Sequence, residues 1–164
     1  KLELLVAVFD PSQVVDETTA LFAGALQDKG LAIRARWRGP VGARFRADPI
    51  RLRQMLSNLL SNAVQHGSQR SAVTLTADGE VDAVVLRVIN SGDPIPAGAL
   101  EAIFEPLVQS PSAGSEAHER SKTSLGLGLF IVREIVLAHG GTIAVESSMA
   151  AGTVFTIRLP RVPA

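Results

Sequence analysis

Residues 48–67, DPIRLRQMLSNLLSNAVQHG, predict one amphipathic helix with a defined start and end. Asp48 is a suitable N-cap, Pro49 fits the first helical position and Gly67 follows the last turn. An apolar stripe at helical spacing consists of Leu52, Met55, Leu56, Leu59, Leu60, Ala63 and Val64. Such a helix needs a second layer against which its apolar face is buried.

The segments around this helix predict further helices and strands that are mostly linked as hairpins. Residues 1–9 suit either a strand or the end of a connecting helix, and Asp78-Gly79 predicts a hairpin turn. The expected strands are 31–37, 43–47, 71–78, 81–90, 141–148 and 152–160, and the other expected helices are 14–29, 97–106 and 126–140. This order favours an α+β two-layer sandwich with helices on one face of a mixed sheet.

Composition excludes several classes of function. The chain has 164 residues, which suits a single domain. Lys plus Arg and Asp plus Glu number 16 each, so the net charge is zero and a nucleic-acid or anionic membrane surface is disfavoured. The absence of cysteine excludes disulfides, cysteine zinc sites and thiol catalysis. No apolar run approaches the roughly 18 residues of a membrane-spanning helix, and the first residues lack the pattern of a signal peptide.

Asn58 and Asn62 are the first candidates for chemistry. They are four residues apart, so they share one face of the helix. Asparagine is unfavourable inside a helix because its amide competes for backbone hydrogen bonds. Two on one face indicate either a solvated polar face or a row of oxygen ligands, and amide oxygens suit a Mg²⁺ ion that also binds phosphates. Gln65 and His66 lie near the same side.

Two glycine-containing segments are further candidates, although each is weak by itself. In VINSGDPIP (88–96), a strand ends at Asn90, and Gly92 permits a close backbone approach, but N-x-G is also an ordinary turn. In SLGLGLFIVREIV (124–136), glycines precede a helix whose free N–H groups favour phosphate. Residues 107–124 are too long for an ordinary connection, which is typical of a lid or a disordered segment.

A family resemblance is carried by four segments in this order: NLLSNAVQH (58–66), VINSGDPIP (88–96), IFEPL (103–107) and the long segment 124–160. Together they resemble the N, G1, F and G2 boxes of the ATP-binding domain of bacterial sensor histidine kinases. Each box alone is unspecific, whereas the long C-terminal match is specific. The resemblance covers residues 10–160, nearly the whole chain.

This resemblance implies the Bergerat ATP-binding fold, in which about three helices cover a mixed, mostly antiparallel sheet. It implies that residues 107–124 form a lid over ATP. Asn62 is implied to hold Mg²⁺ and Asn58 to support the metal and phosphates, so these two are the implied catalytic residues. Asn90 is implied to read the adenine amino group and Ile95 to pack on the ring. The other implied ATP contacts are Gln65, His66, Gly92, Phe104 at the start of the lid, Ser124, Leu125, Gly126, Leu127, Gly128, Leu129 and Thr153.

Four positions depart from the usual pattern of that family. Asn90 stands where Asp is usual, Pro94 replaces a glycine, Gln65 stands where a basic residue is common, and Ser124 replaces the first glycine of the G2 box. The form N-x-G-x-P-I-P nevertheless resembles a minority variant that includes phytochrome-like kinases. We expect Arg120 or Lys122, from the lid, to supply the charge that is missing at Gln65.

The resemblance implies a protein histidine kinase that uses Mg-ATP. None of His66, His118 and His139 lies in a phosphoacceptor helix pattern, and His139 is expected only to end a helix and interact with its dipole. The acceptor histidine is therefore expected on a separate dimerisation domain, reached through residues 1–10, with a response regulator receiver domain downstream. We expect no nucleic-acid partner, no direct membrane contact and a cytoplasmic location, whether or not the parent protein is membrane-anchored.

Three other functions stay open at this point. Chaperone- and topoisomerase-type ATPases resemble this fold, but they place a Glu where Asn58 stands, and an amide cannot activate water. A stand-alone serine kinase of the anti-sigma type transfers phosphate to a protein serine in trans. A degenerate module that senses nucleotide or binds partners without catalysis would account for the four departures, which are Gln65, Asn90, Pro94 and Ser124.

Overall fold

Helices and strands follow one another closely along the chain, and the computed structural model describes residues 2–39, 45–106 and 127–161. Its elements are β1 (Ala7–Phe9), α1 (Pro11–Asp28), β2 (Ala32–Arg38), β3 (Phe45–Ala47), α2 (Pro49–His66), β4 (Ala72–Gly79), β5 (Ala83–Asn90), the 3-10 turns η1 (Ala97–Ala99) and η2 (Ala102–Phe104), α4 (Gly128–Ala138), β6 (Thr142–Ser148) and β7 (Gly152–Pro160). None of the helices in these ranges is long and apolar enough to cross a membrane.

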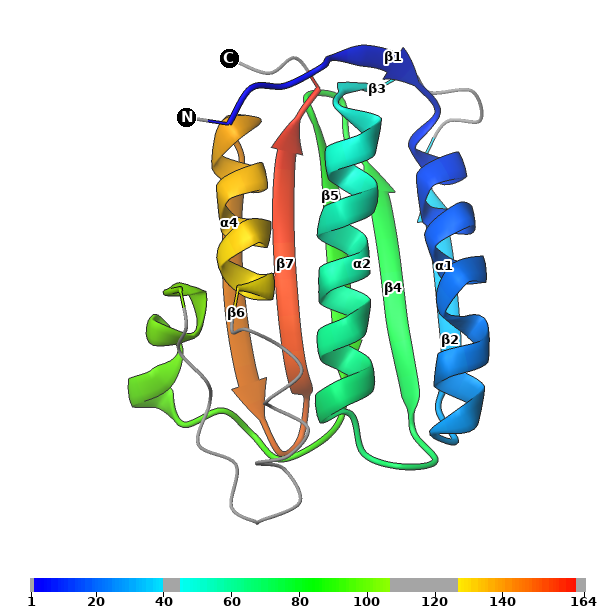
Figure 1. Cartoon of the computed structure of the whole chain (residues 1–164), viewed down its shortest axis with the longest axis vertical. Coiled ribbons are helices and arrows are strands. Elements are labelled where there is room, and N and C mark those ends of the chain that lie inside the picture. Colours follow the sequence, from blue (N-terminus) through cyan, green and yellow to red (C-terminus); the bar gives the residue numbers. More distant parts are fainter. Residues whose placement is uncertain (1, 40–44, 107–126, 162–164) are drawn as a thin grey trace.

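A five-stranded sheet forms one layer, and α4, α2 and α1 lie side by side across one of its faces (Figure 1). The strand order is β2-β4-β5-β7-β6; β2 and β4 are parallel, and the other neighbouring pairs are antiparallel. A second ladder pairs β1 with β3 at the end where α2 begins, so the strand is the correct alternative for the N-terminal segment. The expected α+β sandwich with a mixed, mostly antiparallel sheet is confirmed.

The predicted start of α2 is confirmed by its cap. Asp48 Oδ1 accepts hydrogen bonds from the N–H groups of Ile50 at 3.0 Å and Arg51 at 3.1 Å, and Pro49 takes the first helical position. These contacts satisfy donors that the first turn of any helix leaves unpaired. Asp10 caps α1 in the same way, so that helix starts a few residues before the predicted position.

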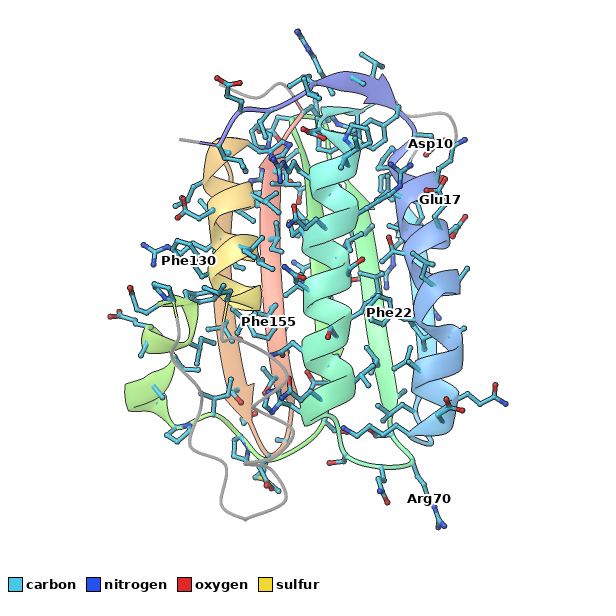
Figure 2. All side chains as sticks on the ribbon, in the orientation of Figure 1. Asp10, Glu17, Phe22, Arg70, Phe130 and Phe155 are labelled. Atoms are coloured by element: carbon cyan, nitrogen blue, oxygen red, sulfur yellow. The ribbon has the colours of Figure 1, made fainter. Side chains whose placement is uncertain are left out.

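The apolar stripe of α2 and the alternating side chains of the strands meet in one core. All members of the stripe lie in the core or against it. On β4, every second side chain is buried: Val73, Leu75 and Ala77. Figure 2 shows Phe155 on β7, enclosed between the sheet and the helices, and Phe22 on α1 on the side toward α2. Burying a large apolar side chain contributes about 1.5–3 kcal/mol, so the two layers stabilise each other.

The single helix predicted over residues 97–106 is wrong, because the chain forms the short turns η1 and η2 there. The segment lies between Pro96 and Pro106, and a proline cannot donate the backbone hydrogen bond that would extend an α-helix. A segment this short gains too few backbone hydrogen bonds to offset the cost of helix nucleation.

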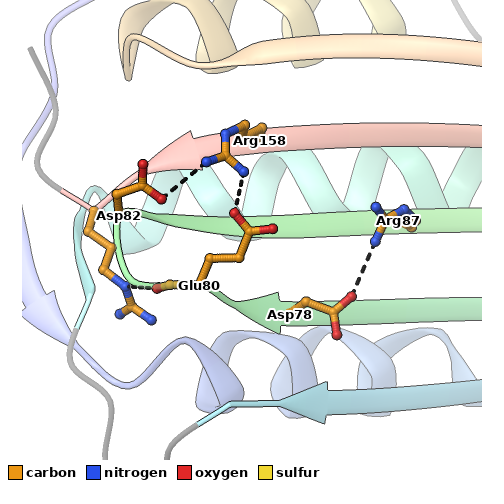
Figure 3. A network of polar contacts seen from close by, with 6 residues as sticks. Asp78, Glu80, Asp82, Arg87 and Arg158 are labelled. Carbon is orange, nitrogen blue, oxygen red and sulfur yellow. Dashed lines mark hydrogen bonds and ion pairs between the residues drawn. The ribbon is translucent and has the colours of Figure 1, made fainter.

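The hairpin predicted around Asp78-Gly79 is confirmed, because β4 and β5 pair antiparallel, but its turn lies further along the chain than predicted. Both residues still pair with β5, and the chain reverses at residues 80–82 instead. On the sheet face away from the helices, Arg158 of β7 forms ion pairs with both acidic side chains of that turn (Figure 3). The β4–β5 ladder is therefore longer than the local Asp-Gly signal predicted, and the side chains of its turn contact β7.

A buried histidine joins α4 to α2 at the end of the molecule that carries β1. His139 is 1% exposed and Asp48 is 3% exposed. The Asp48 N–H donates to His139 Nε2 at 3.1 Å, so the proton of the neutral ring is on Nδ1, which donates to Ile135 O at 2.8 Å. The Leu5 N–H donates to Asp48 Oδ2 at 2.8 Å. His139 ends its helix as predicted, but it also links α4 to α2 and, through Asp48, to the N-terminal segment.

We expect His139→Ala to lower the free energy of unfolding by about 2–4 kcal/mol, because it leaves a cavity and a buried N–H without an acceptor. Urea denaturation measures this change. The matched control is Leu137→Ala in the same helical turn, where the side chain is 53% exposed and the expected loss is within about 1 kcal/mol. Equal losses in the two variants would contradict the importance of this contact.

Candidate functional site

Several candidate residues gather toward the end of the molecule opposite β1, which we call the site end. α2 and β5 end there, the β6–β7 hairpin turns there, and α4 begins partway along α2 with its first turn directed toward this end (Figure 1). Asn58 Nδ2 donates to Gly128 O at 3.2 Å, which joins α2 to α4. The Ser68 N–H donates to Ser91 O at 2.8 Å, which joins the chain after α2 to the chain after β5. The site end thus collects candidate residues that are far apart in the sequence.

Asn58 and Asn62 occupy successive turns of α2 and are both half-buried. The contact with Gly128 uses one N–H of the Asn58 amide. Within the described residues, the Asn62 side chain makes no hydrogen bond. The two amides therefore differ in that only Asn58 makes a described contact with the start of α4.

Asn90 ends β5 opposite Thr153 and is 3% exposed. Its Nδ2 donates to Ser91 O at 3.3 Å, and Oδ1 has no partner among the described residues. This orientation leaves Oδ1, a hydrogen-bond acceptor, without a contact in the described part of the chain.

Two glycines permit backbone contacts at the site end that a side chain would prevent. Gly152 has φ +76°, and a Cβ at this position would collide with the backbone oxygen of Asn90. A Cβ on Gly92 would lie 2.5 Å from the backbone oxygen of His66. The end of β5 is therefore held between the β6–β7 hairpin and the end of α2.

A chain of hydroxyl groups connects the β6–β7 hairpin to the loop after β5. The Ile95 N–H donates to Ser147 Oγ at 2.8 Å, and Ser147 Oγ lies 2.8 Å from Thr153 Oγ1. Ile95 and Thr153 were predicted from the sequence, but Ser147 was missed. The register of the hairpin, which pairs Ser147 with Thr153, is the signal that could have found it.

The start of α4 and the turn η2 border the same end. Phe104 is 8% exposed and packs edge-to-face on Phe155, with 6.2 Å between the ring centroids. Leu127 occupies the N-cap position of α4, Gly128 begins the helix and Leu129 packs against the core. No described side chain caps the first N–H groups of this helix.

Gln65 and His66 lie at the end of α2 on the side toward α1. Gln65 lines a groove of about 420 Å³ between the two helices, and Lys29 donates across it to Val64 O. His66 keeps part of its surface in solvent, but desolvation by the surrounding protein lowers its pKa from the ordinary value, and the charge of Lys29 lowers it further. Gln65 makes no hydrogen bond with the other candidates in the described part of the chain, and its contact with a ligand stays a prediction.

The remaining candidates lie outside the described residues. They are the predicted lid, residues 107–124, its two basic residues Arg120 and Lys122, and the loop residues Ser124, Leu125 and Gly126. Their assigned contacts with a nucleotide stay predictions.

The polar groups at the site end suit a ligand that brings its own charge. Among the described residues, no three or more His, Asp or Glu side chains are grouped in a way that could hold a metal ion. Asn62 offers an amide oxygen, a hard ligand of the kind that Mg²⁺ accepts when phosphates and water supply most of its coordination. These residues therefore fit a Mg²⁺ ion that is shared with phosphates.

Sequence comparison relates the chain to known kinases. The family described as histidine kinase-, DNA gyrase B-, and HSP90-like ATPases matches residues 47–163. The chain is 40% identical over 116 residues to the sensor histidine kinase ZraS of Escherichia coli K12, a match that covers 71% of this chain and 23% of ZraS. It is 31% identical over 152 residues to RcsC of the same organism, which covers 93% of this chain and 16% of RcsC. The chain thus spans less than a quarter of the length of these relatives.

Solved structures share the fold over almost the whole chain. The catalytic domain of histidine kinase ThkA superposes with a TM-score of 0.81 at 28% identity, covering 99% of this chain and 98% of that domain. Full-length ShkA in complex with AMPPNP gives a TM-score of 0.83 at 29% identity, covering 99% of this chain and 32% of ShkA. ThkA in complex with the response regulator protein TrrA gives 0.73 at 25% identity, covering 96% and 42%.

We expect Gly152→Ala to lower the free energy of unfolding by about 1–3 kcal/mol, because a side chain is strained at this φ and its Cβ collides with Asn90. Thermal denaturation measures the loss. Gly98→Ala is the matched control, since a Cβ there meets nothing within 4 Å. Similar losses in both variants would show that the close approach to Asn90 contributes nothing.

The lowered pKa of His66 predicts that stability falls as the pH falls. The unfolded chain takes up the proton near pH 6.5, whereas the folded chain takes it up only at lower pH. The stability that neutral His66 contributes is therefore present above pH 6.5 and is lost as the pH decreases toward the folded-state pKa. Urea denaturation across this range should show a steeper decrease for the wild type than for His66→Gln, and parallel decreases would disprove the assignment.

Proposed function

Because the chain belongs to the family of histidine kinase-, DNA gyrase B-, and HSP90-like ATPases and is a catalytic ATP-binding domain of the sensor histidine kinase type, we propose that its site end binds Mg-ATP and presents the γ-phosphoryl group to a histidine of a separate dimerisation domain. In this proposal, residues 1–164 form one domain. Residues 107–124 form the lid over the nucleotide, and residues 1–10 connect to the dimerisation domain.

The observation that carries this proposal is the orientation of Asn90. Its Nδ2 donates to Ser91 O, which leaves Oδ1 to accept a hydrogen bond from a ligand. Adenine carries a donating amino group where guanine carries an accepting carbonyl oxygen. The site is therefore expected to prefer ATP to GTP, with Ile95 as the apolar group beside the base and Phe104 at the start of the lid.

The phosphates are proposed to lie between α2 and the start of α4. Asn58 already reaches from one helix to the other through Gly128 O. The free N–H groups and the positive end of the helix dipole at Gly128 and Leu129 favour phosphate oxygens. Asn62, one turn further along α2, is the residue proposed to hold Mg²⁺. When bound, this ion would neutralise charge on the phosphates.

The chemistry of these residues favours phosphoryl transfer over hydrolysis. Transfer to a histidine depends mainly on positioning and charge stabilisation, which amides and helix N–H groups supply. An amide cannot take up a proton, so neither Asn58 nor Asn62 activates water as a general base. Any base that the reaction requires is proposed to come from the acceptor domain.

The partners follow from the same assignment. ZraS and RcsC are several times longer than the match to this chain, which leaves room in such proteins for an acceptor domain. ThkA was solved in complex with a response regulator protein. We therefore propose a histidine-containing dimerisation domain as the immediate partner and a response regulator receiver domain as the next acceptor. The use of ATP supports a cytoplasmic location for this domain.

Calorimetric titration with ATP and Mg²⁺ tests the site. We expect Asn62→Ala to weaken binding by about tenfold or more, because the variant loses the proposed metal ligand. GTP is expected to bind more weakly than ATP to the wild type. Ser61→Ala is the matched control, because Ser61 is an exposed neighbour of Asn62 on α2 and is expected to leave the affinity unchanged.

Two results would overturn the proposal. Absence of binding at millimolar ATP would favour the module that binds partners without catalysis. Transfer to a protein serine in trans would favour the serine kinase. Phosphohistidine that forms with Mg-ATP after a dimerisation domain is joined to the chain would exclude both.

A further inference from the structure

Strand β2 carries three arginines at alternate positions, Arg34, Arg36 and Arg38, which we call the arginine row. Side chains two residues apart on a strand share one face of the sheet. Arg38 lies beside Asp78, whose carboxylate also contacts Arg87 on the face away from the helices (Figure 3). The whole row therefore lies on the sheet face away from the helices, which we call the open face, and each of its residues is exposed.

The acidic side chains of the open face do not neutralise this row. Asp78 is shared between Arg87, at 3.2 Å, and Arg38, at 3.8 Å. The two acids of the β4–β5 turn are paired with Arg158. Arg34 and Arg36 have no ion pair or hydrogen bond within the described residues. A chain with zero net charge thus concentrates uncompensated positive charge on one strand.

The backbone of β2 is also incompletely paired. β2 lies at one edge of the sheet, with β4 on one side and no described strand on the other. In a parallel pair, every second residue directs its N–H and C=O groups away from the neighbouring strand. The free edge therefore offers a row of donors and acceptors next to the arginine row, which is the arrangement that strand addition uses.

We propose that the free edge of β2 binds an extended acidic polypeptide segment, which adds to the sheet as a further strand and places alternate carboxylates beside Arg34, Arg36 and Arg38. Directly opposite side chains on paired strands lie within interaction distance, and opposite charges there are favourable. The regular spacing of the arginines favours a strand with an acid at every second position. A nucleic acid would match the charge but would leave the backbone groups of the edge without partners.

A fluorescently labelled peptide in which Glu and Thr alternate tests the proposal by anisotropy. Trp37 is the single tryptophan of the chain and lies in β2, so its emission reports on the same strand. We expect binding that weakens with salt, slower hydrogen exchange at β2 amides in the complex, and roughly tenfold or greater weakening in Arg34→Glu, Arg36→Glu. The variant Arg34→Gln, Arg36→Gln removes the two charges without reversing them and should weaken binding less. It provides the test if the charge-reversed variant does not fold.

Matched controls separate strand addition from simple charge attraction. Arg46→Glu alters an exposed arginine of β3 and is expected to leave peptide binding unchanged. A peptide of the same composition with its glutamates grouped together is expected to bind more weakly than the alternating one. ATP affinity is expected to be unchanged in the β2 variants, so failure of this proposal is distinct from failure of the nucleotide site.

Three outcomes would overturn the inference. Equal binding of the grouped and alternating peptides would show that strand geometry plays no part. Tighter binding of a single-stranded oligonucleotide than of the peptide would assign the surface to nucleic acid. No binding of any acidic peptide would show that the arginines serve only to keep the edge strand from pairing with other chains.

Discussion

The hydrogen bond from the Asp48 N–H to the His139 ring is the constraint on which the helix layer depends. It joins the N-cap residue of α2 to the C-cap residue of α4, and both partners are almost fully buried. A buried polar group without a partner costs about as much as a core cavity, so this junction tolerates little rearrangement. Because α2 and α4 are held at this end, the distance between them at the site end is also restricted.

The site end is built by a different means. Its segments are joined by backbone contacts that glycine permits, at Gly152 against Asn90 and at Gly92 against His66. These contacts hold the end of β5 in place without filling the space in front of it with side chains. The side chains of Asn58, Asn62 and Asn90 there are neutral amides, which agrees with the proposed nucleotide that brings its own charge and a metal ion. Such a site acts by positioning its ligand rather than by exchanging protons with it.

Charge is distributed unevenly over this molecule although its net charge is zero. On the open sheet face, Asp78, Glu80 and Asp82 lie at or next to the β4–β5 turn, and Arg158 pairs with the last two. The arginine row on β2 lies on the same face with little compensation. The net charge of zero argues against a charged binding surface. This argument is incomplete, because the net charge contains no information about which strand carries each charge. Local charge along one strand is still sufficient to select a partner.

The sequence by itself determined the elements that depend on near neighbours. The periodicity of apolar residues predicted α2, capping predicted its first residue, and the four-residue spacing of Asn58 and Asn62 placed both on one face. The order of helices and strands predicted the α+β sandwich, and four motifs in order predicted the family. These features are local or depend only on sequence order, so no knowledge of tertiary contacts was needed.

Only the tertiary structure decided the features that join distant residues. Asp48 and His139 are 91 positions apart, and no local pattern indicates that their polar groups meet. The contact of Gly152 with Asn90 and the longer β4–β5 ladder likewise depend on strands brought together by folding. The turn of the β4–β5 hairpin lies beyond Asp78-Gly79 because weak local preferences are overridden when burial and hydrogen bonding with distant segments contribute more free energy. The helix predicted over residues 97–106 is absent for a local reason, since prolines flank a segment too short to nucleate an α-helix.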